Sequence, residues 1–96
     1  MRFTTRPTLE GTFGMVSSTH WIASQSAQRM LVLGGNAFDA AAAGGFVLHV
    51  VEPHLNGPGG DLPAIVSVAG YPAPRVLCGQ GPAPAGATPE AFAAMG

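Results

Sequence analysis

Three histidines, His20, His49 and His54, are the side chains of this sequence best suited to acid–base chemistry, because imidazole titrates near neutral pH. His49 falls inside a long apolar stretch, which predicts a buried and hydrogen-bonded side chain. His20 lies close to an expected helix start, where a positive charge is disfavoured, so we expect a structural role. Pro53 separates His49 from His54, so these two do not share a helix face. No Cys/His spacing of the zinc-site kind occurs, and we expect no metal site.

The other reactive groups form no recognised catalytic pattern either. The serines and threonines lack the G-x-S-x-G arrangement of a hydrolase nucleophile. Cys78 is the single cysteine, so it cannot form an internal disulfide, and we expect a small buried side chain. Glu52 and Asp61 fit a helix cap and a loop acid as well as they fit a carboxylate pair. We therefore expect no catalytic residue in this chain.

A glycine-rich loop, NGPGGD at residues 56–61, is the next candidate. It is neither G-x-G-x-x-G nor a P-loop, and the chain contains no lysine to meet a phosphate. The sequence favours a tight connection in which glycine permits positive φ or close approach of the backbone. A place in the lining of a larger active site is the alternative.

Two helices joined by a glycine turn are expected to position these groups. Apolar residues recur at spacings of three and four over residues 20–33, which predicts the first helix. Ser18 or Thr19 would supply the capping hydroxyl, and the Gly34–Gly35 pair would end the helix in the left-handed region. Just before this helix, residues 14–18 are a strand candidate.

The second helix is predicted over residues 37–51. Asn36 caps it, Asp39 completes an arrangement that resembles a capping box, and Pro53 ends it. No charged residue lies between Asp39 and Glu52, and such an apolar pattern predicts burial on every side. A helix of this length spans about 22 Å, less than the roughly 30 Å of a bilayer core, so we do not expect a membrane span.

The second half of the chain reads as a β-hairpin followed by a helix. Strands are predicted over residues 64–69 and 75–78, with a turn at Gly70. Thr88, followed by proline and glutamate, is a strong helix start. This helix has barely begun at Gly96, so we expect the chain to be truncated at its C-terminus.

The composition indicates that much of the surface of this chain is covered by other chain segments or by another molecule. Of its 96 residues, 47% are hydrophobic and only 9% are charged, against about 25% in ordinary domains. More chain, a partner subunit or a membrane would provide such cover. With four arginines, no lysine and a net charge of -1, we expect no nucleic-acid partner. No apolar run follows Arg2 and Arg6, so the sequence lacks a secretory pattern, and we expect a cytoplasmic protein.

Taken together, several stretches resemble the start of the γ-glutamyltransferase (glutathione hydrolase) family. The sequence motifs of the family occur here in the same order and at the same spacing. They are Gly34–Ala37, Asp39–Ala41, Val51–His54, the glycines of the loop at 56–61 and the segment from Leu77 to Thr88. The resemblance covers residues 14–92. On this basis residues 1–13 are an irregular leader and residues 14–96 a partial γ-glutamyltransferase-like domain.

The resemblance implies an α+β fragment, a helical hairpin plus a short β-hairpin, from a four-layer αββα fold of the N-terminal-nucleophile hydrolase type. It also implies a longer precursor that cuts itself and exposes a threonine, whose hydroxyl attacks a γ-glutamyl amide with its own α-amine as base. No cofactor is implied. The expected partners are the remainder of the large subunit, the small subunit and a γ-glutamyl compound such as glutathione.

Gln80 is the one residue that the resemblance places at a substrate. Transferases of this family carry an Arg-Glu pair before Ala-Pro, and that arginine holds the substrate carboxylate. Here Gln80 and Gly81 occupy those positions, which predicts weaker glutamyl selectivity, by roughly 1.5–3 kcal/mol. Arg75 is the nearest other cation and is expected to be solvated. A branch that acts on another amide, a non-catalytic interaction module whose second helix docks on a partner, and a gene remnant are the alternatives.

Overall fold

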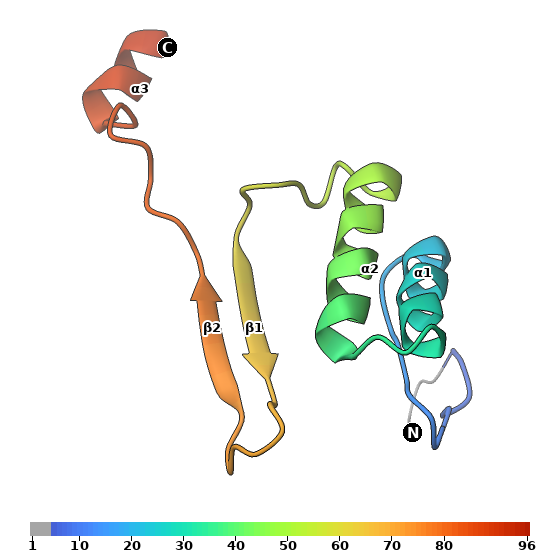
Figure 1. Cartoon of the computed structure of the whole chain (residues 1–96). Coiled ribbons are helices and arrows are strands. Elements are labelled where there is room, and N and C mark those ends of the chain that lie inside the picture. The colour runs from blue at the N-terminus through green and yellow to red at the C-terminus, as the bar shows by residue number, and fades with distance from the viewer. Residues whose placement is uncertain (1–4) are drawn as a thin grey trace. The chain divides into compact units, whose positions relative to one another are not determined.

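The computed structural model describes residues 5–96, which divide into two compact units at residues 58 and 59. The first unit contains helices α1 (Trp21–Val32) and α2 (Ala37–Val51), and the second contains strands β1 (Leu62–Val66) and β2 (Arg75–Gly79) and helix α3 (Pro89–Met95) (Figure 1). This is the predicted α+β composition with a helical hairpin and a β-hairpin. Residues 1–4 of the expected leader lie outside the described residues.

Helix α1 begins one residue later than predicted and has a different cap. His20 is the N-cap, and its Nδ1 accepts a hydrogen bond from the Ile22 N–H at 3.2 Å. The prediction of Ser18 or Thr19 as cap is therefore wrong. Both hydroxyls are engaged elsewhere: Ser18 Oγ donates to the His20 carbonyl at 2.7 Å, and Thr19 donates to Glu52.

The glycine turn ends α1 as predicted. Gly34 has φ of 95°, a left-handed conformation that glycine adopts at low cost. Its N–H donates to the Leu31 carbonyl at 3.1 Å, and the Gly35 N–H donates to the Met30 carbonyl at 2.8 Å. These two bonds are those of a Schellman motif, which satisfies carbonyls that the helix end leaves unpaired.

Helix α2 confirms its predicted bounds and its capping box. The Asp39 N–H donates to Asn36 Oδ1 at 3.0 Å, and the Asn36 N–H donates to Asp39 Oδ2 at 2.9 Å. The carboxylate near the first turn also suits the helix dipole. At the other end, Glu52 is the C-cap and Pro53 follows it.

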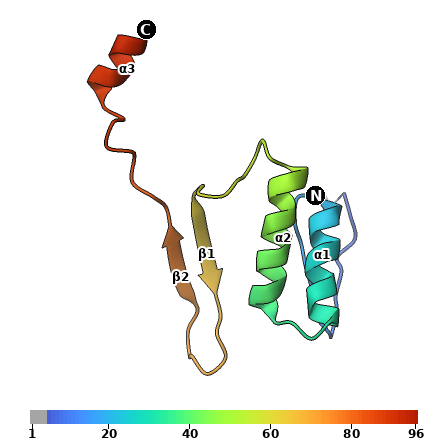
Figure 2. The same ribbon diagram turned by 45° about the horizontal axis from the view of Figure 1, so that its top comes forward.

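The two helices lie side by side and antiparallel, and they meet along a seam of small residues (Figure 2). Ala23, Ala27 and Ala40 are the buried hydrophobic residues among those described, joined by Gly44. A Cβ at Gly44 would lie 3.4 Å from the Ala27 Cβ, so the backbones approach closely there. The core of the first unit is therefore made of alanine and glycine.

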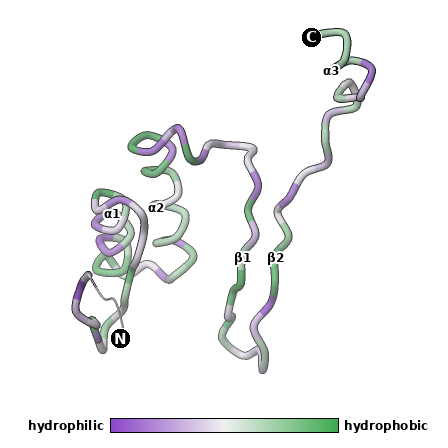
Figure 3. The backbone as a smooth tube through the Cα atoms, turned by 180° about the vertical axis from the view of Figure 1, so that it is seen from behind, coloured by the Kyte–Doolittle hydropathy of each residue, from purple (hydrophilic) through white to green (hydrophobic). Residues whose placement is uncertain are grey.

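Burial of α2 on every side is not observed in this chain. The side of α2 away from the seam carries Phe46 and Val50, which are 72% and 78% exposed. The two helices differ in hydropathy: α2 is apolar or neutral over its middle turns, whereas hydrophilic residues recur along α1 (Figure 3). The missing polar face of α2 is thus an exposed apolar face.

Residues 14–18 do not form the predicted strand, because they have no ladder partner among the described residues. They run extended beside the two helices (Figure 1). The amino-acid pattern is that of a strand, but a ladder needs a second chain segment at hydrogen-bonding distance.

The second unit is built on an antiparallel two-stranded sheet. Its register pairs Leu62 with Gly79 and Ile65 with Val76. The first strand begins two residues before its predicted start and ends at Val66, because residues 67–74 form the connection. A Cβ at Gly79 would lie 2.6 Å from the Leu62 carbonyl oxygen, so only glycine allows this pairing.

Helix α3 confirms its predicted start. Thr88 caps it, the Ala91 N–H donates to Thr88 Oγ1 at 3.1 Å, and Pro89 occupies the first turn. None of its residues is buried. No helix within residues 5–96 has both the length and the apolar character that crossing a bilayer requires.

Candidate functional site

Gln80 stands immediately after β2, and its side chain is exposed. Side chains alternate along a strand, so Val76, Cys78 and Gln80 point to one side of β2, and Arg75 and Leu77 to the other. The contact between Cys78 Sγ and Gln80 Oε1, at 3.8 Å, agrees with this placement. When the thiol donates to Oε1, the amide nitrogen of Gln80 remains available to a ligand.

Arg75, the nearest other cation in the sequence, lies far from Gln80 in the β-hairpin. It lies at the opposite end of β2, roughly 16 Å away along an extended chain, and on the other side of the strand. Its guanidinium carbon stacks 3.7 Å from the centre of the Tyr71 ring, a cation–π contact worth about 0.5–1 kcal/mol at an exposed site. The expected solvated arginine is therefore exposed but held against an aromatic ring of the hairpin connection.

Cys78 is exposed rather than buried, so that prediction is wrong. It lies on the side of the hairpin that also carries Ile65 and Val76, both 77% exposed. A two-stranded sheet has no second layer unless other elements supply it. No layer that would bury this thiol is therefore present within residues 5–96.

The histidines occupy three different settings. His20 has the structural role that was expected, because its ring caps α1. His49 is only half-buried and meets the Phe46 ring edge-on, with centroids 5.8 Å apart, so the prediction of a buried, hydrogen-bonded imidazole is wrong. His54 is exposed in the turn after α2.

A polar cluster joins the start of α1 to the end of α2. Thr19 donates to a carboxylate oxygen of Glu52, and Ser18 Oγ lies 2.6 Å from Ser24 Oγ. Thr19 and Glu52 are 33 residues apart in sequence, and no local pattern indicates such a pair. Sequence reasoning missed this contact. Glu52 is the C-cap of α2, as the helix-cap interpretation predicts.

The loop at residues 56–61 is the tight connection that the sequence favoured. Asn56 Nδ2 donates to the Glu52 carbonyl at 3.2 Å, and Gly59 has φ of 82°. Within residues 5–96, no three His, Cys, Asp or Glu side chains converge as metal ligands would.

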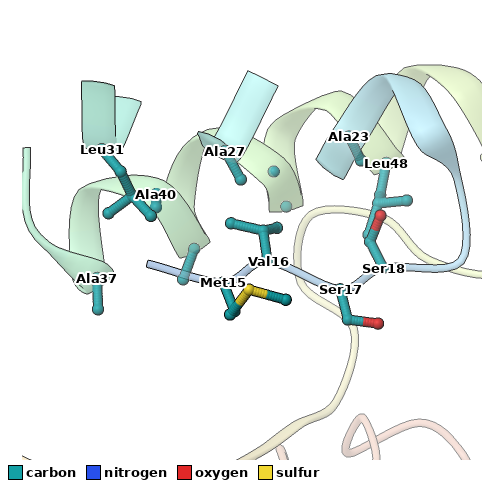
Figure 4. Close-up of a pocket in the computed structure, with 13 residues that line it drawn as sticks. Met15, Val16, Ser17, Ser18, Ala23, Ala27, Leu31, Ala37, Ala40 and Leu48 are labelled. Atoms are coloured by element: carbon teal, nitrogen blue, oxygen red, sulfur yellow. The ribbon is translucent and has the colours of Figure 1, made fainter. Parts of the chain in front are cut away.

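An apolar hollow of about 390 Å³ lies between the two helices and residues 15–18 (Figure 4). Its larger lining side chains are Met15, Val16, Leu31 and Leu48, and alanine and glycine line the rest. None of the lining residues is titratable, so this hollow offers packing surface rather than acid–base groups.

Comparison with known proteins places these elements in a family. The family model described as Gamma-glutamyltranspeptidase matches residues 23–96. The chain is 40% identical over 82 residues to the glutathione hydrolase proenzyme of Bacillus subtilis subsp. natto, covering 85% of this chain and 14% of that protein. It is 57% identical over 51 residues to the glutathione hydrolase-like YwrD proenzyme of Bacillus subtilis (strain 168), covering 53% and 10%.

A solved structure described as "Structure of LmbA2991T421A" is also similar. It is 67% identical, with a TM-score of 0.83, and the match covers 98% of this chain and 16% of that chain. This chain thus spans between 10% and 16% of the length of these relatives. Every helix and strand described above has its place in a much longer relative.

Proposed function

The chain belongs to the γ-glutamyltranspeptidase family, and on that premise we propose that it is the first part of the large subunit of an enzyme that hydrolyses or transfers a γ-glutamyl or related amide. The continuous match to residues 23–96 carries the proposal. The 40% identity to glutathione hydrolase proenzymes over 82 residues supports it. The larger fold is then the four-layer arrangement of the N-terminal-nucleophile hydrolases, with α1 and α2 in a helical layer.

In this proposal the chemistry belongs to a threonine that lies outside the 96 residues. Its hydroxyl adds to the amide carbonyl, the amine leaves with a proton, and an acyl-enzyme ester forms. Water or an acceptor amine then takes the acyl group and regenerates the hydroxyl. The helical hairpin and the β-hairpin position the chain, and residues 1–96 alone are inactive.

The partners of this chain are then the remainder of the large subunit and the small subunit. The relatives are named proenzymes, which fits a precursor that is cut into two subunits. The exposed apolar side of α2 fits a helix that packs under other elements of the same enzyme, because apolar patches of this kind mark contact surfaces.

Gln80 is the substrate-contacting residue of the proposal. Its amide nitrogen donates hydrogen bonds without charge, so a ligand group that is neutral, or held by other residues, suits it better than a lone carboxylate. An amide other than γ-glutamyl is therefore the second candidate substrate. It is supported by 48% identity over 50 residues to an oxamate amidohydrolase proenzyme of Klebsiella pneumoniae and by 47% identity over 47 residues to the acylase ACY 1 proenzyme of Pseudomonas.

A chimera tests the proposal. The segment of the solved relative that this chain matches is replaced by residues 1–96, and the purified product is analysed by gel for cleavage into two subunits and with γ-glutamyl-p-nitroanilide for hydrolysis. We expect cleavage and turnover in the chimera and none with the 96-residue chain alone. An uncleaved, folded chimera, or turnover by the chain alone, would contradict the proposal.

Substitution of Gln80 in the same chimera tests the substrate class. Gln80→Arg is expected to raise kcat/KM for the γ-glutamyl substrate about 10-fold to 150-fold relative to a neutral acyl amide, as a restored charge-assisted bond predicts. Gln80→Ala is the matched control, and it lacks both the amide and the charge. Equal ratios for all three forms would remove Gln80 from the substrate site. A folded, monodisperse 96-residue chain that also fails to support the chimera would favour an interaction module.

A further inference from the structure

Glu52 lies where three segments of the first unit meet. It is the C-cap of α2, and its N–H donates to the Leu48 carbonyl at 2.9 Å. Its carboxylate accepts a hydrogen bond from Thr19, in the segment before α1. Its carbonyl accepts a hydrogen bond from the side chain of Asn56, the first residue of the glycine-rich loop, at 3.2 Å. One residue thus bonds to the segment before α1, to α2 and to the loop that follows.

The bond from Thr19 joins the two helices at the open end of the hairpin. The start of α1 and the end of α2 lie together at the end opposite to the glycine turn (Figure 1). At the glycine turn the chain itself connects the helices, whereas Thr19 and Glu52 are 33 residues apart in sequence. The bond therefore holds together two helix ends that the chain does not connect directly.

The residues on either side of Thr19 are fixed by the first turn of α1. Ser18 Oγ donates to the His20 carbonyl at 2.7 Å and lies 2.6 Å from Ser24 Oγ. The Ser24 N–H donates to the same His20 carbonyl at 3.1 Å. The position of the Thr19 hydroxyl is thus linked to the integrity of the first turn of α1.

The carbonyl of Glu52 fixes the start of the glycine-rich loop. Besides the side chain of Asn56, the Leu55 N–H donates to this oxygen, at 3.1 Å. Asn56 and Gly57 are half-buried, whereas Pro58 is exposed. The loop is therefore held at its first residues, next to Glu52.

We propose that Glu52 is a positioning residue, which couples the segment before α1 to the start of the glycine-rich loop and so holds that loop in place. Its side chain binds one segment and its carbonyl binds the other, so a change on one side alters the stability of the other side. A coupling of this kind is reciprocal. The coupling itself lies within the first unit, whereas its bearing on catalysis rests on the proposed function.

Amide hydrogen exchange of the 96-residue chain tests the coupling, because the hydrogen-bonded amides of Ser24 and Leu55 report on the two sides. Thr19→Val removes the hydroxyl. It should speed exchange of the Leu55 amide about threefold to tenfold, as loss of a partly exposed bond to a carboxylate predicts. Thr19→Ser keeps the hydroxyl and is the matched control.

The reverse experiment starts from the loop. Asn56→Ala removes the donor to the Glu52 carbonyl, and exchange of the Ser24 amide should rise by a similar factor because the coupling is reciprocal. Gly57→Ala is the control, because a Cβ there meets nothing within 4 Å. Effects confined to the mutated side in both experiments would overturn the proposal. Faster exchange of the Gly35 amide, at the far end of the hairpin, would also overturn it, because the hairpin would then have loosened as a whole.

Variants of Glu52 separate the role of its carboxylate from that of its backbone. Glu52→Gln keeps an oxygen that can accept from Thr19, and Glu52→Ala removes it, while both variants keep the carbonyl. We expect the Ser24 and Leu55 amides to exchange about threefold to tenfold faster in Glu52→Ala and at nearly unchanged rates in Glu52→Gln. Equal rates in the two variants would contradict the proposal.

The chimera tests the bearing of the coupling on catalysis. Glu52→Ala is expected to lower kcat/KM for γ-glutamyl-p-nitroanilide about tenfold, because a small displacement of a positioning element is costly to turnover, and Glu52→Gln should restore it. Equal kcat/KM in the two variants would overturn the positioning role of Glu52. A chimera that has no turnover with the unchanged chain would contradict the proposed function alone, because the exchange experiments decide the coupling.

Discussion

Gly35 is the residue of the helical hairpin at which a single methyl group should do most damage. The Gly35 N–H donates to the Met30 carbonyl at 2.8 Å, and a Cβ at Gly35 would lie 2.8 Å from that same oxygen. It would also lie 3.2 Å from both Cβ and Oδ2 of Asp39, the carboxylate of the α2 capping box. Gly35→Ala should therefore destabilise both the end of α1 and the start of α2.

The size of the effect follows from the two contacts. Weakening the Schellman bond costs about 0.5–1.5 kcal/mol, and disturbing the N-cap of α2 costs about 1 kcal/mol. We expect the free energy of opening of the helix ends to fall by roughly 2 kcal/mol, which is a factor of about 30 in the opening equilibrium. Gly45→Ala is the matched control, because a Cβ there meets nothing within 4 Å and alanine in a helix interior is favoured by about 1 kcal/mol.

Amide hydrogen exchange is the suitable assay, because it reports opening of each helix without requiring global two-state unfolding. In Gly35→Ala, amides in the last turn of α1 and the first turns of α2 should exchange faster than in the unchanged chain. In Gly45→Ala, amides of α2 should exchange more slowly. The helical signal in far-UV circular dichroism should fall in Gly35→Ala and rise in Gly45→Ala. If both variants shift exchange in the same direction, or if Gly35→Ala changes it by less than threefold, the close approach at Gly35 is not what fixes the turn.

Four further perturbations test other parts of the structure. Asn36→Ala should destabilise α2 by about 1 kcal/mol through loss of its cap, measured by exchange of the first-turn amides. His20→Ala should weaken the start of α1 by a similar amount, whereas His20→Asn should preserve it, because asparagine is a preferred cap. Gly79→Ala should speed hydrogen exchange of the β1 and β2 amides, because its Cβ would lie 2.6 Å from the Leu62 carbonyl oxygen. Gly81→Ala is the control and should leave this exchange unchanged, because a Cβ there meets nothing within 4 Å. Phe46→Ser should leave exchange in the free chain unchanged, since the ring is 72% exposed, but should lower the melting temperature of the chimera by several degrees.

The elements that the sequence predicted well are those whose signals are local. The cap of α2, its end before Pro53, the left-handed glycine after α1 and the start of α3 at Thr88 all depend on residues within one helical turn of the boundary. Each signal satisfies main-chain groups at a helix end, and this requirement does not depend on the rest of the fold. These boundaries were therefore predictable to within a residue.

The predictions that failed depend on distant partners. The sequence predicts Ser18 or Thr19 as the cap of α1, but Thr19 bonds to Glu52, which is 33 residues away, and the cap is His20. His49 and Cys78 were expected to be buried because their neighbours in sequence are apolar. Burial requires a second layer, and in the described residues neither the outer side of α2 nor the open side of the β-hairpin has one.

For Gln80 the family resemblance predicts a substrate-binding role, and the structure supplies its position directly after β2. Alternation of side chains along β2 puts it on the side opposite to Arg75, which pairs with Val66 at the other end of the strand. A substrate-binding role depends on groups that would converge from other parts of a longer enzyme. The sequence of this chain contains no signal for them, and only the chimera assay addresses that role.

The distribution of apolar side chains explains why a helical hairpin with strong caps has so weak a core. Its buried residues are alanines, and the helices of 12 and 15 residues are near the length at which isolated helices are marginal. The exposed Phe46 and Val50 would each contribute about 1.5–3 kcal/mol if buried, whereas the methyl group of one buried alanine contributes about 0.8 kcal/mol. The caps thus fix where the helices begin and end, while the largest apolar side chains on the outer side of α2 bury little surface within the described residues.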